Sequence, residues 1–253
     1  MPVKNLSAEV AGVEKPKVII LKTGSTYPAI REQFGDFDAW FLRALADDLD
    51  LTVLDVVQAP PASAPSEWAG IVITGSPAMV SDRALWSEDT ARWIKQAVEA
   101  GVPLLGVCYG HQLLAHALGG KADYHPQGRE TGTHTVRLLD AAQSDPLFGQ
   151  LPAEFPAHLT HKQSALELPA GAVLLADSSF EPHQAFRVGE HAWGVQFHPE
   201  FSDQIMRAYL DVQSPELVAE GLDAEALARG VQPAPDASRL LTLFSEYLLQ
   251  RQA

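Results

Sequence analysis

The heptapeptide GVCYGHQ, residues 106–112, contains Cys108, the only cysteine in the chain, with a glycine two positions away on each side. It follows the apolar run VPLLGVC (102–108) and opens HQLLAHAL (111–118), whose apolar residues repeat at helical spacing. This order predicts a buried strand that turns at once into a helix. Glycine suits such a turn because it has no Cβ to obstruct closely approaching backbone segments. A lone cysteine is also a small core hydrophobe, so packing and nucleophilic chemistry both remain open for Cys108.

The same alternation of apolar strands and helices runs from residue 17 to residue 120. Strands are expected at KVIILK (17–22), LTVLDVV (51–57) and GIVITG (70–75), and helices at DFDAWFLRALADDL (36–49) and over 87–100. Strands that are apolar throughout and alternate with helices form parallel sheets covered on both faces. The pattern therefore predicts an α/β fold.

The second half of the chain has a different pattern. Residues 121–197 are rich in strand patterns, which predicts an inserted or appended antiparallel portion, and 202–250 returns to helix. We therefore expect a loose N-terminal tail at 1–16, one α/β domain over 17–210, and a C-terminal helical extension, 211–253, packed on the same domain.

Composition limits the kind of partner. The 253 residues carry a formal net charge of −14, and 46% of them are hydrophobic. A negative field repels phosphate backbones and anionic membrane surfaces, so we expect no nucleic acid and no membrane partner. The start of the chain lacks the apolar stretch of a signal peptide, and a single cysteine allows no internal disulfide. We expect a cytoplasmic protein.

A thiolate nucleophile needs a partner for proton transfer, and WGVQFHPEF (193–201) offers one. We expect an apolar strand over 192–197 that ends at His198 and Glu200. Residues i and i+2 at an extended strand end point the same way, so Glu200 is expected to hold one imidazole nitrogen while the other faces the thiol. Pro199 stiffens this pair because its ring fixes φ. The combination favours the nucleophilic interpretation of Cys108.

An oxyanion formed at the attacked carbonyl needs backbone N–H donors. The segment VITGSPAMVSD (72–82) ends a strand with Gly75-Ser76-Pro77, a turn that can present a free N–H at the carboxyl edge of the sheet. The N–H of Tyr109, directly after the nucleophile, is the expected second donor. Taken alone, without the turn at Cys108, the Gly75–Pro77 segment is better interpreted as an ordinary turn.

Three segments together, GVCYGHQLLAHALGG (106–120), TGSPAMVSD (74–82) and GVQFHPEF (194–201), resemble a class I glutamine amidotransferase domain with a Cys-His-Glu triad. The similarity covers about residues 17–210. It is greatest to the glutaminase domain of GMP synthetase and its free-standing relatives. The resemblance implies a flavodoxin-like, mostly parallel sheet with helices on both faces, and hydrolysis of a γ-glutamyl amide.

The resemblance also implies a role for each matching residue. It makes Cys108 the nucleophile, His198 the general base and then acid, and Glu200 the residue that orients His198. It assigns the oxyanion hole to the backbone amides of Ser76 and Tyr109 beside Gly75. Contacts to the α-amino-acid end of the substrate fall to Gln112, Gly132, Thr133 and His134.

The sequence departs from the family at two points. Gly75-Ser76-Pro77 stands where family members often have Gly-Gly-Pro, and serine should serve because the reacting group is a backbone amide. His111 stands where other members have methionine or another residue, and it is either a pocket-lining or structural residue or a rival base. His161 lies in a segment similar to a family loop near the active site, so it either shields the site or is an ordinary loop histidine. The loop 23–35 is a further candidate for the pocket wall.

No cofactor is expected, because the histidines lack metal-ligand spacing and no glycine-rich phosphate loop is present. The expected ligand is a small molecule, glutamine or another γ-glutamyl compound. About 40 residues follow position 210, too few for a nucleotide-binding synthetase domain, for which roughly 100 or more residues are usual. Three functions remain: a glutaminase that supplies a possible separate synthetase subunit, an independent hydrolase of γ-glutamyl peptides or amines, and a non-catalytic binding module with a relict site. The complete triad argues against the third.

Overall fold

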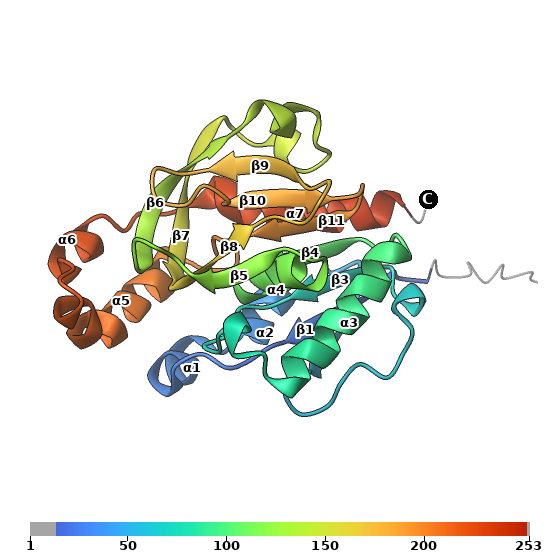
Figure 1. Cartoon of the computed structure of the whole chain (residues 1–253), viewed down its shortest axis with the longest axis horizontal. Helices are drawn as coiled ribbons and strands as arrows, with labels where there is room; N and C mark the ends of the chain where they lie inside the picture. The colour runs from blue at the N-terminus through green and yellow to red at the C-terminus, as the bar shows by residue number, and fades with distance from the viewer. Residues whose placement is uncertain (1–13, 252–253) are drawn as a thin grey trace, which may run out of the picture.

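The computed structural model describes residues 14–251, so most of the tail expected at 1–16 lies outside the described residues (Figure 1). Its central feature is a nine-stranded sheet in the order β2-β1-β3-β4-β11-β10-β9-β6-β7. The strands are β2 (Asp50–Asp55), β1 (Lys17–Lys22), β3 (Gly70–Ile73), β4 (Leu104–Val107), β11 (Ala192–Val195), β10 (Ala185–Val188), β9 (Val173–Asp177), β6 (Glu130–Leu138) and β7 (Glu154–His161).

The first five strands in this order, β2 to β11, are parallel. Their order has the flavodoxin-like pattern, which confirms the expected fold class. Side chains along β1 alternate between two apolar cores, with Val18 and Ile20 in one and Ile19 and Leu21 in the other. A strand buried on both faces needs apolar residues at every position, which explains the uninterrupted apolar runs in the sequence.

Helices cover both faces of the parallel half. Helices α3 (Leu85–Glu99) and α4 (Tyr109–Ala117) share one core, and α7 (Pro235–Gln250) and part of α2 (Phe37–Ala44) share the other. Asp36 caps α2, since its carboxylate accepts a hydrogen bond from the N–H of Phe37 at 2.9 Å. Burial of α7 in the main core ties the C-terminal helices to the sheet.

The strand-rich segment extends the same sheet instead of forming a separate unit. Strands β10, β9, β6 and β7 pair antiparallel to one another beyond β11. A small second sheet pairs β5 (Lys121–Tyr124) with β8 (Gln163–Glu167). Short 3-10 turns lie at Pro65–Glu67, Val80–Asp82, Asp140–Ser144 and Phe148–Gln150.

Two helical features differ from the sequence-based expectation. A short helix, α1 (Pro28–Phe34), occupies part of the expected loop 23–35 and ends at Gly35, whose φ is +87°. The expected domain boundary at residue 210 falls inside α5 (Asp203–Ala219), and α6 (Ala224–Arg229) follows this helix. Among residues 14–251, no helix is both long enough and apolar enough to cross a membrane.

Candidate active site

The segment around Cys108 forms a tight strand-to-helix turn between β4 and α4. Cys108 has φ +52° and ψ −101°, a backbone conformation that residues with a side chain rarely adopt. A Cβ added at Gly106 would lie 2.4 Å from the carbonyl oxygen of Gly110, and one at Gly110 would lie 2.6 Å from that of Ile73. Both flanking glycines are therefore required by close backbone contact, as the sequence predicted.

The side chain of Cys108 is directed to the carboxyl edge of the parallel strands. Its Sγ lies 3.9 Å from the carbonyl oxygen of Thr160 on β7, and the residue is 7% exposed. Helix α4 begins at the next residue, Tyr109. A helix N-terminus stabilises a nearby negative charge, which suits a nucleophile that carries such a charge during reaction.

His198 and Glu200 form a buried pair beside the thiol. His198 Nδ1 and Glu200 Oε1 are 2.6 Å apart, while His198 Nε2 has no hydrogen-bond partner within residues 14–251. Burial disfavours the charged imidazole, but the Glu200 carboxylate and Cys108 outweigh it and raise the pKa of His198 to about 10. His198 is therefore protonated at neutral pH, with Nε2 free to meet a ligand.

The backbone that carries this pair differs slightly from the prediction. The strand expected over 192–197 ends at Val195, so His198 and Glu200 lie in the turn beyond it and not at a strand end. Backbone bonds fix the turn: His198 N–H donates to the carbonyl of His158 at 2.9 Å, and Phe201 N–H donates to that of His198 at 3.3 Å. Phe201 also stacks on the imidazole, with ring centroids 4.1 Å apart. The expected pairing of His198 with Glu200 is present all the same, because the turn brings the side chains of residues two apart together, as an extended strand end would.

The Gly75-Ser76 turn follows β3 next to this pair. Two threonines hold it: Thr23 Oγ1 donates to the carbonyl of Thr74 or Gly75, each at 2.9 Å, and Thr23 N–H donates to Thr74 Oγ1 at 3.1 Å. Ser76 Oγ accepts the N–H of Ala78 at 3.1 Å, which closes the turn. The backbone of Ser76 is therefore rigidly placed at the same sheet edge as Cys108.

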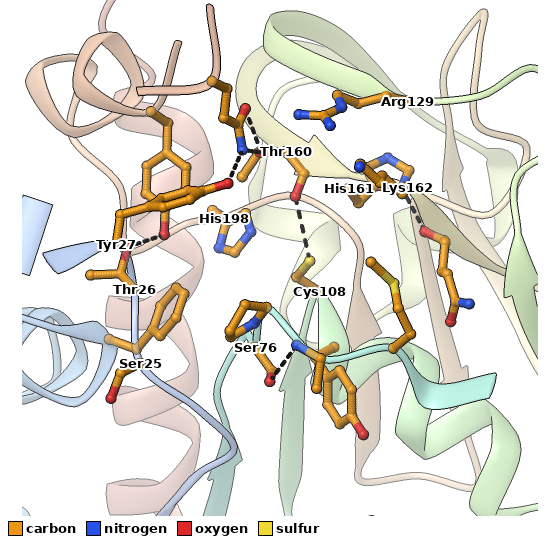
Figure 2. Close-up of a pocket in the computed structure, with 18 of the residues that line it drawn as sticks. Ser25, Thr26, Tyr27, Ser76, Cys108, Arg129, Thr160, His161, Lys162 and His198 are labelled. Atoms are coloured by element: carbon orange, nitrogen blue, oxygen red, sulfur yellow. Dashed lines mark hydrogen bonds between the residues drawn. The ribbon is translucent and has the colours of Figure 1, made fainter. Parts of the chain in front are cut away.

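A cavity of about 410 Å³ joins these groups (Figure 2). Of the residues predicted from the sequence, Cys108, His198, Ser76, Tyr109 and Gln112 line it. Its wall also includes Ser25, Thr26, Tyr27 and Pro28 from the expected pocket loop. The volume falls in the range of roughly 300–1,000 Å³ typical of small-molecule sites.

Three predicted contact residues lie elsewhere. Gly132, Thr133 and His134 are on β6 and are not among the residues lining the cavity. Thr133 Oγ1 bonds His158 Nδ1 at 3.0 Å, and His134 Nε2 bonds the carbonyl of Thr131 at 2.6 Å. Gln112 does line the cavity, but its amide nitrogen donates to the Gln163 carbonyl at 2.7 Å and to Gln196 Oε1 at 3.0 Å.

The sequence leaves two possible roles for each of His111 and His161, and the structure places these histidines in different environments. His111 is fully buried away from the cavity, where it packs on Phe186, and burial lowers its pKa to about 3. His161 is no loop residue, because it ends β7 and lines the cavity. Its Nε2 lies 2.7 Å from Glu130 Oε2, and its Nδ1 lies 2.7 Å from the Gln163 carbonyl. Burial lowers the pKa of His161, but the Glu130 carboxylate more than offsets this and raises it above the usual value.

Several cavity residues have no signal in the sequence. Arg129 precedes β6, Lys162 follows β7, and α5 contributes Tyr209, Gln213 and Glu216. The spacing of the α5 residues, i, i+4 and i+7, marks one helix face, which a helical pattern alone assigns to packing. Within the described residues, no group of three or more His, Cys, Asp or Glu side chains is placed to hold a metal ion.

Comparison with known proteins relates this geometry to a family. The family model for glutamine amidotransferase class-I matches residues 36–211. The glutamine-hydrolyzing GMP synthase of Thermosipho africanus is 34% identical over 148 residues, which are 56% of this chain and 27% of that protein. The chain thus matches only about a quarter of the length of this relative.

Solved structures show the same fold. A glutamine amidotransferase from Thermotoga maritima superposes with a TM-score of 0.70 and 20% identity, covering 95% of this chain and 99% of that one. A glutamine amidotransferase from Methylobacillus flagellatus gives a TM-score of 0.64 and 24% identity, covering 94% of this chain and 90% of that one. Nearly the whole length of the chain therefore has a structural counterpart in each of these proteins.

Proposed function

Because the chain belongs to the class-I glutamine amidotransferase family, a family of enzymes, we propose that it hydrolyses the γ-amide of glutamine to glutamate and ammonia through a thioester on Cys108. The observation that carries this proposal is that Cys108 and His198 line one cavity, with His198 Nδ1 held 2.6 Å from Glu200 Oε1. A thiol, an imidazole and an orienting carboxylate are the groups that acyl transfer through cysteine requires.

The protonation state of His198 gives the order of steps. With its pKa raised to about 10, the imidazolium stabilises the Cys108 thiolate before substrate arrives. The thiolate attacks the γ-carbonyl carbon, and the resulting oxyanion accepts hydrogen bonds from the N–H groups of Ser76 and Tyr109. His198 Nε2 then gives its proton to the departing nitrogen, so that ammonia leaves and the thioester forms.

Hydrolysis of the thioester reverses the role of the histidine. Neutral His198 takes a proton from a water molecule as that water attacks the thioester carbonyl. Collapse of the second oxyanion breaks the C–S bond and releases glutamate. Glu200 holds Nδ1 throughout, which keeps Nε2 directed at the reacting atoms and stabilises each imidazolium.

The direct test is ammonia release from glutamine by the purified chain. Cys108→Ala is expected to abolish release, and wild-type protein quenched during turnover should carry a glutamyl adduct on the Cys108 peptide.

The names of the relatives refer to GMP synthase, and the family resemblance suggests a synthetase that accepts the ammonia. Turnover that appears only when such a synthetase is added supports the partner-dependent form. Release of ammonia from glutamine by Cys108→Ala at the wild-type rate would refute the proposal.

A second substrate class is favoured by the width of the cavity. Side chains of Tyr27, Tyr209 and Gln213 line it in addition to Cys108 and His198, and a leaving ammonia molecule needs none of these three. Gln213 Nε2 contacts Tyr27 OH at 3.3 Å and Thr160 Oγ1 at 3.2 Å, which makes a wall of polar and aromatic groups. We propose γ-glutamyl amines and peptides as alternative substrates. A kcat/KM for a γ-glutamyl dipeptide panel that stays well below the value for glutamine decides against them.

A further inference from the structure

A second histidine–carboxylate pair, His161 with Glu130, lies beside the cavity and takes no part in the proposed steps. The two residues face each other across β6 and β7, and their side chains are 1% and 3% exposed. Figure 2 shows His161 on the opposite side of Cys108 from Ser76. Removing two charges from water costs free energy, and apolar side chains of similar volume often stabilise a fold equally well or better. Stability alone therefore does not explain this buried pair.

The hydrogen bonds of His161 fix its protonation state. Nδ1 lies 2.7 Å from the carbonyl oxygen of Gln163, and a carbonyl oxygen only accepts, so Nδ1 carries a proton. Nε2 lies 2.7 Å from Glu130 Oε2, which also accepts the side-chain amide of Gln184 at 3.2 Å, as an ionised carboxylate does. Nε2 therefore carries a proton as well. His161 is an imidazolium with both N–H groups bonded inside the protein, so any role it has comes from holding its partners in place.

Gln163 is the residue that His161 holds, and three elements of the site meet at it. Its carbonyl oxygen also accepts Gln112 Nε2 at 2.7 Å, one turn of α4 after Cys108. Its side-chain Oε1 accepts the N–H of Ser81 at 3.3 Å, and its Nε2 donates to Ser81 Oγ. The residue is 1% exposed and lines the cavity. Gln163 thus joins the connection between β7 and β8 to the nucleophile helix and to the segment after β3.

Residues 76–82 form a loop that begins at the expected oxyanion donor, the N–H of Ser76, and we term it the oxyanion loop. Its first four residues line the cavity, and Ser81 belongs to the 3-10 turn that ends it. The two threonines described above hold the turn that precedes the loop, and Gln163 holds its far end. A loop fixed at both ends keeps its N–H groups in one orientation, which an oxyanion donor requires.

We propose that His161 and Glu130 are positioning residues that hold the oxyanion loop through Gln163. The loop held in this way keeps the Ser76 N–H aligned with the carbonyl that Cys108 attacks. The inference rests on the proposed thioester chemistry for its effect on rate, whereas the hold on the loop is a property of the folded chain. Loss of the pair should therefore lower kcat and loosen the oxyanion loop, and it should leave the reactivity of the thiol unchanged.

The first test replaces the ion pair with apolar side chains of similar size. The double variant His161→Phe/Glu130→Met should keep a melting temperature near or above that of the wild type, because neither charge is left unpaired in the interior. Its kcat for glutamine should nevertheless fall roughly 10- to 100-fold, the cost of a misplaced reacting group. Gln163→Met, which removes both side-chain bonds to Ser81, should give a similar loss. A wild-type kcat in the double variant overturns the inference.

Two single variants separate the hydrogen bond from the charge and from other histidine pairs. In Glu130→Gln the new amide can donate to Nε2 of a neutral ring whose Nδ1 still donates to Gln163, so most of the wild-type kcat should remain. His116→Phe removes the His116–Glu88 pair, which is not among the cavity residues, and should change no kinetic constant. A loss in Glu130→Gln equal to that in the double variant would show that the pair acts by its charge, against the positioning role.

Two measurements without turnover distinguish failure of this inference from failure of the proposed function. Hydrogen exchange of the backbone amides of the oxyanion loop should be faster in the double variant and in Gln163→Met than in the wild type. Alkylation of Cys108 by iodoacetamide, which needs a thiolate but no oxyanion donor, should keep its wild-type rate. These two results support the positioning role even where the wild type hydrolyses no glutamine. Unchanged exchange in the loop, or exchange that rises equally throughout the chain, overturns it even where the wild type is an active glutaminase.

Discussion

Gly75 lies against the imidazole of His198, so closely that an added Cβ would stand 3.0 Å from His198 Cε1. The same Cβ would be 3.4 Å from Cε1 of Phe37, whose ring stacks on the imidazole at a centroid distance of 6.4 Å. The turn after β3 thus limits where the histidine ring can sit. It joins the expected oxyanion site to the proton-transfer site by direct contact.

Gly75→Ala should therefore reduce activity without unfolding the protein. The methyl group pushes the imidazole by a few tenths of an ångström or more, and small misplacements of reacting groups cost up to roughly 100-fold in rate. We expect kcat to fall roughly 10- to 100-fold with a melting temperature close to wild type. Gly230→Ala is the matched control, since its Cβ would meet nothing closer than 3.5 Å. A Gly75→Ala enzyme with wild-type kcat would show that the ring is not constrained by this contact.

Glu200 sets the pH range over which His198 is a proton donor. The Glu200 carboxylate helps raise the pKa of His198 to about 10, so its neutralisation in Glu200→Gln should lower that pKa. The imidazolium is then lost at a lower pH, and the alkaline limb of kcat/KM should move toward neutrality. Measurement of kcat/KM against pH for both proteins checks the direction. An unmoved alkaline limb would mean that another group donates the proton.

Removal of the His198 side chain and removal of the Glu200 side chain should reduce activity to different extents. His198→Ala removes the proton shuttle and is expected to approach the inactivity of Cys108→Ala, whereas Glu200→Ala leaves the imidazole in place and should retain some activity. Comparison of the two kcat/KM values at one pH is sufficient. Greater damage in Glu200→Ala would show that their roles are misassigned.

His111 is expected to matter for stability and not for chemistry. Its side chain is fully buried, its pKa is lowered to about 3, and its ring centroid is 4.9 Å from that of Phe186. His111→Ala should lower the free energy of unfolding by roughly 2–5 kcal/mol, as for other large-to-small core changes. Its kcat should stay near wild type below the melting transition. A stable but inactive His111→Ala protein would identify this histidine as the base.

The sequence predicted the parts of the site that are local in the chain. The turn at Cys108 needs only its two glycines and the adjacent strand and helix, and His198 with Glu200 needs only a spacing of two residues. Arg129 and Glu216 had no such signal, because they are 87 residues apart and meet only through the packing of α5 on the β6–β7 edge. Gly132, also expected to contact the substrate, is not among the residues that line the cavity, although it lies only three residues beyond Arg129. Position in a folded sheet, which no short motif encodes, decides such contacts.

The backbone at Cys108 gives the last prediction. Its φ of +52° with ψ of −101° strains any residue that has a Cβ, whereas glycine adopts positive φ freely. Cys108→Ala and Cys108→Gly should both be inactive, so their stabilities are compared without any effect of turnover. Within a helix or strand, glycine in place of alanine lowers the free energy of unfolding by roughly 0.5–1 kcal/mol. Here the free energy of unfolding of Cys108→Gly should instead exceed that of Cys108→Ala by about 1 kcal/mol. Chemical denaturation of the two proteins measures the difference. A more stable Cys108→Ala would mean that the turn relaxes once the thiol is gone, and that the strain depends on the nucleophile itself.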